Sequence, residues 1–223
     1  MSVPRLAERQ VSLPAGDAGA VTGDLVVPPG AAGIVVFAHG SGSSRLSSRD
    51  RGVASALQRT GFATLLFDLL TPSEERRDDV TGELRFDIPF LAGRLRQVMT
   101  WVHAQGDLAA YPLGLFGAST GAAAALVAAA GDDGVGAIVS RGGRPDLAQD
   151  ALERVTAPTL LIVGGLDTPV VGMNRSAFDR LAAADKELTI VPGASHLFEE
   201  PGKIEEVARL AASWFERWLV RAA

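Results

Sequence analysis

Apolar residues alternate along this chain between short, nearly unbroken runs and longer segments in which they recur every three or four positions. The short runs are typical of strands buried on both faces, and the longer segments of amphipathic helices. The runs predict strands at 33–40, 62–70, 113–119, 135–143, 158–167 and 187–196. The longer segments predict helices at 48–61, 86–105, 120–130, 145–155, 174–184 and 202–220.

The first thirty residues have a different pattern. Two short strand-like segments, 9–15 and 23–28, flank the turn-forming sequence GDAGAVTG, which favours an antiparallel strand pair. Alternating strands and helices then indicate a mostly parallel, doubly wound sheet of the α/β class. No repeat, low-complexity tract or linker divides the 223 residues, so we expect a single domain over 1–223.

Composition narrows the possible functions. The formal net charge is −5 and the basic residues do not cluster, so we expect no nucleic-acid partner. The absence of cysteine excludes disulfides, thiolate metal sites and a cysteine nucleophile. No group of histidines and carboxylates has the spacing of a metal site, so neither a metal nor a cofactor is implied. The sequence VVFAHGSGSSR imitates a dinucleotide-binding loop, but Arg45 stands where its third glycine belongs.

Two observations bear on location. The first sixteen residues contain no apolar segment of the kind that signal peptides carry. The longest weakly polar run is shorter than the roughly 20 residues of a membrane span. We therefore expect a cytoplasmic protein that does not associate with a membrane. Its expected partner is a small-molecule substrate. The sequence does not indicate an oligomeric state.

The residues with chemical potential follow predicted strands. Ser119 lies between Gly117 and Gly121 at the junction of a strand and an alanine-rich helix. Glycines on both sides of a serine indicate a turn too tight for neighbouring side chains. Asp167 and His196 end two later strands. Because parallel strands end at the same edge of a sheet, we expect these side chains to share one site.

Ser119, Asp167 and His196 occur in the chain order of the α/β-hydrolase triad. On these motifs the sequence resembles the α/β-hydrolase superfamily, and more narrowly its dienelactone-hydrolase-like branch, over nearly the whole chain. The resemblance implies that Ser119 is the nucleophile, His196 the base and Asp167 the acid that orients the imidazole. It also implies an oxyanion hole formed by the backbone N–H groups of Ser41 and Thr120.

The base has few candidates, because the chain contains three histidines. His103 lies inside a predicted amphipathic helix, away from any strand end. His39 opens the predicted oxyanion loop, where the family uses histidine as a structural residue. His196 is left as the base.

The acid has more alternatives. Asp167 follows the strand after which the family places its acid, 29 residues before the histidine at 196. Asp68 also ends a predicted strand, and the pair at 132–133 lies beyond the alanine-rich helix. Asp68 is the main alternative to Asp167.

Two further features bear on substrate binding. Arg141 lies at the end of a predicted strand. We expect it either to form a salt bridge with an acidic residue such as Asp68 or Asp167, or to bind a carboxylate or other polar group on the acyl part of the substrate. The segment 69–90 is expected to be a solvated connection that can overhang the site. The connection at 141–145 is too short for a large cap domain, so we expect a shallow, open pocket.

These features predict a serine hydrolase that cleaves small, accessible carboxylic esters or lactones through an acyl-enzyme. Thioester cleavage or acyl transfer by the same residues, or ligand binding without catalysis, are the alternatives. Dienelactone hydrolases generally carry a cysteine nucleophile and basic residues near the histidine. This chain instead has Ser119, and Glu199 and Glu200 follow His196, so a dienelactone substrate is not expected.

Overall fold

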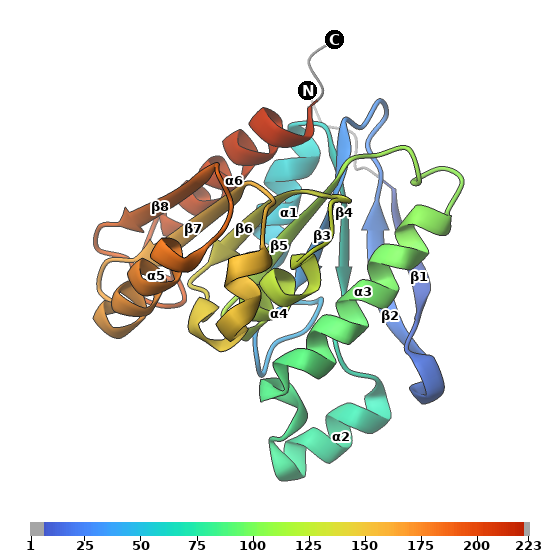
Figure 1. Cartoon of the computed structure of the whole chain (residues 1–223). Coiled ribbons are helices and arrows are strands. Elements are labelled where there is room, and N and C mark those ends of the chain that lie inside the picture. The colour runs from blue at the N-terminus through green and yellow to red at the C-terminus, as the bar shows by residue number, and fades with distance from the viewer. Residues whose placement is uncertain (1–6, 221–223) are drawn as a thin grey trace.

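A sheet of eight strands runs through the centre of the molecule, in the order β1-β2-β4-β3-β5-β6-β7-β8 (Figure 1). The structure, a computed structural model, describes residues 7–220; residues 1–6, on which part of the signal-peptide expectation rests, and 221–223 lie outside it. β1 pairs with β2 and β2 with β4 in antiparallel fashion, and the other neighbours are parallel. The strands are β1 (Glu8–Pro14), β2 (Ala20–Val26), β3 (Gly33–Ala38), β4 (Phe62–Phe67), β5 (Leu113–Ala118), β6 (Val135–Arg141), β7 (Thr159–Gly164) and β8 (Lys186–Val191).

Helices cover both faces of this sheet, as the alternating sequence pattern predicts (Figure 1). Side chains of β3 alternate between the two cores: Ile34 and Val36 belong to one, and Val35 and Phe37 to the other. One face carries α1 (Ser48–Arg59) and α6 (Lys203–Leu219), and the other carries α3 (Ile88–Ala104), α4 (Thr120–Ala129), the 3-10 segment η3 (Pro145–Arg154) and α5 (Thr168–Arg180).

The alanine-rich α4 lies close against the sheet. Nine of its ten residues are buried. A Cβ atom on Gly121 would overlap the carbonyl oxygens of Ala38 and His39, at the end of β3. A Cβ atom on Gly117 would overlap the backbone of Ala122. Glycine at both positions therefore allows the first turn of α4 to contact the backbone of neighbouring strands.

The segment 69–90 is largely exposed, as expected for a solvated connection, but it is not irregular. It contains α2 (Pro72–Thr81) and a short 3-10 turn, η2 (Leu84–Phe86). Thr71 caps α2: its hydroxyl accepts from the N–H of Glu74 at 3.3 Å, and the Glu74 carboxylate accepts from the N–H of Thr71 at 2.7 Å. α2 lacks an apolar stripe, which is why hydrophobic periodicity did not reveal it, whereas this reciprocal capping pattern is visible in the sequence.

Two other predicted helices differ in detail. The helix expected over 145–155 is a 3-10 segment with a kink at Gln149, whose φ of 47° and ψ of −125° are not helical. The helix expected at 174–184 begins earlier, at Thr168, directly after Asp167. Pro169 in its first turn is typical of a helix start, because that position needs no backbone N–H.

We expect Gly121→Ala to destabilise the protein by about 1–3 kcal/mol or more, because the new methyl group overlaps the backbone of β3. Gly93→Ala is the matched control: Gly93 lies inside α3, and a Cβ atom at this position would have open space around it. Alanine there should stabilise the helix by about 0.5–1 kcal/mol. Urea unfolding of both variants measures the difference, and equal effects would contradict the inferred close approach.

Candidate active site

Ser119 sits on a strained turn between β5 and α4. Its φ of 51° and ψ of −119° are uncommon for a residue other than glycine. Backbone hydrogen bonds hold this conformation: the N–H of Ser119 donates to the carbonyl of Arg141 at 3.2 Å. The carbonyl of Ser119 accepts from the N–H groups of Ala122 and Arg144, each at 3.1 Å. The turn therefore fixes the position of the serine side chain at the carboxyl edge of the sheet.

His196 bridges Ser119 and Asp167. Its Nε2 lies 3.3 Å from Ser119 Oγ, and its Nδ1 lies 2.7 Å from Asp167 Oδ2. The Asp167 and His196 side chains are 16% and 36% exposed, respectively. The structure thus brings together the three residues that the sequence assigned to a triad. In this geometry the imidazole can take a proton from the serine hydroxyl while the carboxylate orients the ring.

The loops that carry the acid and the base are tied to each other. The N–H of Leu166 donates to the carbonyl of Ala194 at 2.9 Å. The Glu200 carboxylate accepts from the N–H of Ser195 at 3.0 Å, next to His196, and this bond lowers the pKa of Glu200. The first contact ties the two loops to each other, and the second holds the loop of His196 in shape.

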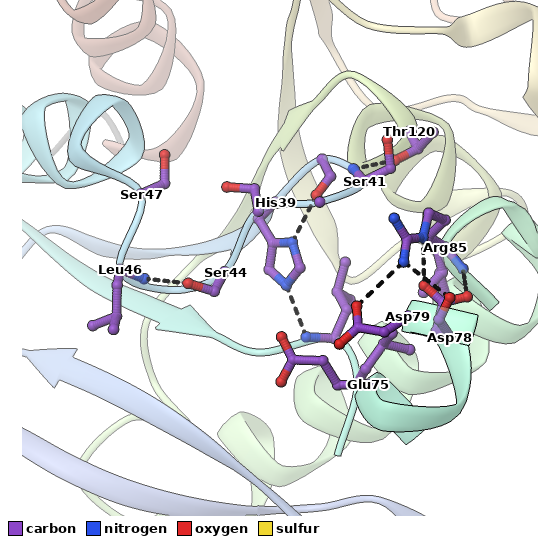
Figure 2. Close-up of a pocket in the computed structure, with 16 residues that line it drawn as sticks. His39, Ser41, Ser44, Leu46, Ser47, Glu75, Asp78, Asp79, Arg85 and Thr120 are labelled. Atoms are coloured by element: carbon purple, nitrogen blue, oxygen red, sulfur yellow. Dashed lines mark hydrogen bonds and ion pairs between the residues drawn. The ribbon is translucent and has the colours of Figure 1, made fainter. Parts of the chain in front are cut away.

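The alternative residues lie elsewhere or have other partners. His39 binds backbone on both ring nitrogens: Nδ1 lies 2.9 Å from the carbonyl of Gly40, and Nε2 accepts from the N–H of Leu69 at 3.0 Å (Figure 2). His103 is exposed on α3, and the aspartate pair at 132–133 lies beyond the far end of α4. The structure does not bring any of them to Ser119.

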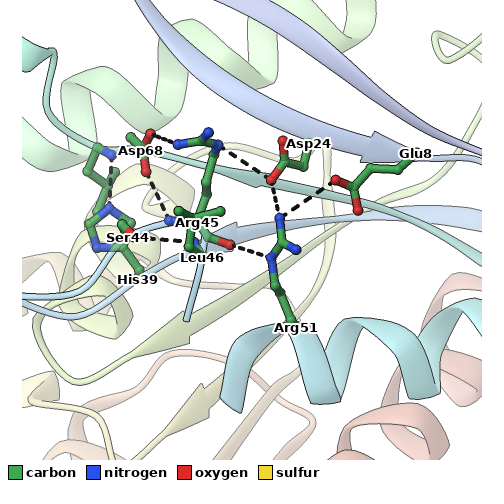
Figure 3. Close-up of polar contacts among 9 residues, drawn as sticks. Glu8, Asp24, His39, Ser44, Arg45, Leu46, Arg51 and Asp68 are labelled. Carbon is green, nitrogen blue, oxygen red and sulfur yellow. Dashed lines mark hydrogen bonds and ion pairs between the residues drawn. The ribbon is translucent and has the colours of Figure 1, made fainter. Parts of the chain in front are cut away.

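Asp68 belongs to an ionic network that anchors the loop 41–47 (Figure 3). It pairs with Arg45 Nη1 at 2.7 Å and accepts from the Arg45 N–H at 2.9 Å. Arg45 also approaches Asp24 of β2 at 3.4 Å, and Arg51 of α1 binds Asp24 at 2.6 Å. Burial alone would lower the pKa of Arg45, but the two carboxylates raise it above its ordinary value. Asp68 therefore fixes this loop and does not contact His196.

The two predicted oxyanion-hole residues are in direct contact. The N–H of Ser41 donates to Thr120 Oγ1 at 2.9 Å (Figure 2). Thr120 is the first residue of α4, and the first N–H groups of a helix have no intrahelical acceptor. The structure therefore places a helix N-terminus beside Ser119 and the loop of Ser41 against it.

A pocket of about 410 Å³ adjoins this contact (Figure 2). Residues of α2 and η2 form one wall, so the segment 69–90 borders this pocket as an ordered helix. The described residues that line the pocket include Ser41 and Thr120 but not the three triad side chains. The other lining residues are His39, Gly40, 42–44, Leu46, Ser47, Leu69, Leu70, Glu75, Asp78, Asp79, Arg85, Leu91.

The charged residues of this wall were missed by sequence reasoning. Arg85 Nε donates to Asp78 Oδ2 at 2.6 Å, and Arg85 also lies 3.5 Å from Asp79. Burial alone would raise the pKa of Asp78, but hydrogen bonds from Arg85 and Leu84 outweigh it and lower the pKa. The capping box has the same effect: burial opposes ionisation of Glu74, but hydrogen bonds from Thr71 and Arg94 lower its pKa. Both carboxylates hold α2 and η2 in place.

Comparison with known proteins identifies the family. The model of the dienelactone hydrolase family matches residues 21–220. The chain belongs to the dienelactone hydrolase family. A crystal structure of a dienelactone hydrolase from Anabaena variabilis ATCC 29413 is 55% identical, with a TM-score of 0.93 over 96% of this chain and 99% of that one. This match confirms the α/β-hydrolase fold without a large cap.

More distant structures share the fold. Est1E from Butyrivibrio proteoclasticus is 15% identical, with a TM-score of 0.77 over 93% of this chain and 98% of that one. The Pyrococcus furiosus esterase PF2001 is 17% identical, with a TM-score of 0.76 over 96% and 92% of the two chains. At these identities the likeness concerns the fold alone.

Two curated relatives carry a different name. Proteins of Mycobacterium tuberculosis strains CDC 1551 / Oshkosh and H37Rv, both named "Putative phosphoribosyl transferase", are 57% identical over 214 residues. The match covers 95% of this chain but 47% of each of those proteins. The chain therefore spans less than half the length of these relatives.

Two other kinds of feature are absent from the described part of this dienelactone hydrolase family member. Over residues 7–220, no helix has both the length and the apolar character needed to cross a bilayer. Within the same range, no group of three or more His, Cys, Asp or Glu residues is arranged to hold a metal ion.

Arg141 pairs with neither expected partner. Its Nη2 donates to Asp50 Oδ1 of α1 at 2.9 Å, and both side chains are buried, 6% and 4% exposed. Burial lowers the pKa of this guanidinium, and the Asp50 carboxylate opposes that effect. Because Arg141 packs under α1, its partner is Asp50 of that helix, and not Asp68 or Asp167 as expected. A side chain so enclosed does not reach a substrate, so the structure favours the salt bridge over the expected substrate contact.

We expect Arg141→Leu or Asp50→Leu to cost about 3–5 kcal/mol of unfolding free energy, because each leaves one buried charge unpaired. The double variant should recover a large part of that loss, since neither charge then remains. Chemical denaturation of the parent and the three variants gives the interaction free energy between the two side chains. Additive losses would mean that the two charges do not stabilise each other.

Proposed function

We propose that this protein is a serine hydrolase that cleaves small carboxylic esters or lactones through an acyl-enzyme intermediate. The observation that carries the proposal is the continuous hydrogen-bonded path from Asp167 through His196 to Ser119. Ser119 ends this path, on a strained turn at the start of α4. Membership of the dienelactone hydrolase family supports hydrolase chemistry at this position.

In the proposed mechanism, Ser119 Oγ forms a bond to the carbonyl carbon while its proton passes to His196 Nε2. The carbonyl electron pair moves to oxygen, giving a tetrahedral oxyanion next to the N-terminus of α4. Its collapse breaks the bond to the leaving alcohol, which takes the proton from His196. A water molecule, deprotonated by His196, then bonds to the acyl carbon. The bond from that carbon to Ser119 Oγ breaks, His196 returns the proton to Oγ, and the acid is released. Asp167 fixes the imidazole tautomer and stabilises its cation throughout.

The pocket beside the site supports a substrate without a carboxylate. Glu75, Asp78 and Asp79 line it, together with a single arginine, Arg85. Arg85 is engaged by Asp78 and Asp79, so it does not offer a free cation to an anionic substrate. We therefore propose neutral esters or lactones as substrates, although relatives of this family are named for a dienelactone.

The alternative functions fit these observations less well. A protein that only binds a ligand does not need an ordered Asp167–His196–Ser119 path. Acyl transfer requires that water be kept from the acyl-enzyme, whereas the His196 side chain is 36% exposed. The name phosphoribosyl transferase belongs to proteins of which this chain covers 47%, so the match alone does not assign that activity to the shared region.

Ser119→Ala should abolish labelling by a fluorophosphonate probe and nearly all hydrolysis of p-nitrophenyl acetate, because the attacking oxygen is lost. The parent protein should be labelled at Ser119, as judged by mass spectrometry of the labelled peptide. His103→Gln is the control, since His103 is exposed on α3, and its turnover should stay within about a few-fold of the parent. An unlabelled parent, or a folded Ser119→Ala protein with full turnover, would refute the proposed nucleophile.

Asp167→Asn should lower kcat by about 10⁴-fold, because asparagine favours the wrong imidazole tautomer. Asp68→Asn is the matched control, since Asp68 pairs with Arg45 in the structure, and it should have a far smaller effect. Steady-state kinetics with p-nitrophenyl acetate separates the two. If Asp68→Asn caused the larger loss, Asp68 would be the acid.

A further inference from the structure

The hydroxyl of Thr120 occupies an unusual place in the candidate site. It accepts the N–H of Ser41 at 2.9 Å, so a backbone donor assigned to the oxyanion hole is directed at a side chain. Thr120 is 3% exposed and lines the pocket beside Ser119. Among the hydrogen bonds between residues 7–220, this hydroxyl acts as an acceptor and not as a donor. Its own proton therefore remains available to a ligand.

The loop of Ser41 is held firmly against the nucleophile turn. A Cβ atom on Gly40 would lie 3.1 Å from Ser119 Cβ and 3.2 Å from the carbonyl oxygen of Ala118. His39 and Arg45 fix the two ends of this loop through Leu69 and Asp68. The Ser41–Thr120 hydrogen bond is thus part of an anchored structure, and the residue that carries the hydroxyl directly follows Ser119 at the start of α4.

We propose that Thr120 Oγ1 is a catalytic hydrogen-bond donor to the oxyanion, a role that rests on the proposed serine hydrolase function. A hydroxyl can accept one hydrogen bond while it donates another. The N–H of Ser41 then donates to Thr120 Oγ1, and the Thr120 hydroxyl donates to the negatively charged oxygen. Donation from Ser41 polarises the hydroxyl and strengthens its own hydrogen bond. No proton is transferred in this step, and the backbone N–H of Thr120 supplies a second donor.

This arrangement differs from an oxyanion hole that uses two backbone N–H groups alone. The hydroxyl is oriented by Ser41 before the substrate arrives, so little reorganisation is needed when the charge develops. An interaction made mainly with the developing oxyanion affects kcat rather than KM. If the Thr120 hydroxyl served only as the acceptor for the Ser41 N–H, its removal would not lower kcat in this selective way.

Thr120→Val tests the donor, because valine keeps the shape and removes the hydroxyl. We expect kcat for p-nitrophenyl acetate to fall by about 10²–10³-fold with little change in KM. Thr120→Ser restores a hydroxyl and should retain turnover within about ten-fold of the parent. A trifluoromethyl ketone, which forms a tetrahedral adduct with an active serine, should lose affinity for the valine variant by a similar factor. If circular dichroism shows that Thr120→Val does not fold, Thr120→Ala takes its place as the variant that lacks the hydroxyl.

Three outcomes would overturn the proposal. If Thr120→Val keeps or gains turnover, the Ser41 N–H reaches the oxyanion directly and the hydroxyl merely blocks it. If kcat falls as far in Thr120→Ser as in Thr120→Val, then the methyl group and its packing determine turnover, and the hydroxyl does not. If the parent protein is neither labelled by a fluorophosphonate nor active on esters, the serine hydrolase function itself fails, and this role with it. Labelling of the parent therefore separates the two failures.

Discussion

The close approach of α4 to the end of β3 is the constraint on which the candidate site depends. Gly121 permits this approach, because any larger residue would overlap the carbonyl groups of Ala38 and His39. With α4 held there, the chain must turn sharply at Ser119, and a strained backbone of this kind costs on the order of 1–3 kcal/mol. The three backbone hydrogen bonds around Ser119 and the burial of α4 offset that strain. The position of the serine hydroxyl is therefore a consequence of packing.

Strand order then determines how the other two residues reach Ser119. β6 lies between β5 and β7 in the sheet, and β8 forms the edge beyond β7. Since neighbouring strands are about 4.8 Å apart, the loop after β8 must return across β7 and β6 to bring His196 back. Gly142, at the end of β6, accommodates it: a Cβ atom there would lie 2.9 Å from the His196 carbonyl oxygen. β6 thus supports the site through its backbone, while the side chain of its last residue, Arg141, is turned toward α1.

Much of this was predictable from sequence because it depends on local patterns. Buried apolar runs predicted the strands, and the order of Ser119, Asp167 and His196 at their ends predicted which side chains meet. The helix α2 was missed because its polar surface gives no periodic signal, although its capping box at Thr71 and Glu74 did mark its start. The kink at Gln149 has no evident sequence signal.

Contacts between distant segments were the least predictable. Arg141 and Asp50 are 91 positions apart, and neither has a neighbouring motif that names its partner. Several aspartates follow strands or begin helices in this chain, so charge alone left the choice between them open. The same holds for the hydrogen bond between Ser41 and Thr120, which depends on how two loops pack rather than on the identity of either residue.

The loop 39–47 links these non-local contacts into one unit. His39 joins it to Leu69, in the segment that leads into α2, and Arg45 joins it to Asp68 and Asp24. Ser41 joins it to the first residue of α4. The loop therefore contacts both the segment that leads into α2 and the residue whose hydroxyl accepts the Ser41 N–H. In this fold, the wall of the pocket and the proposed oxyanion donor are thus both joined to one short loop, through His39 and Arg45 on one side and Ser41 on the other.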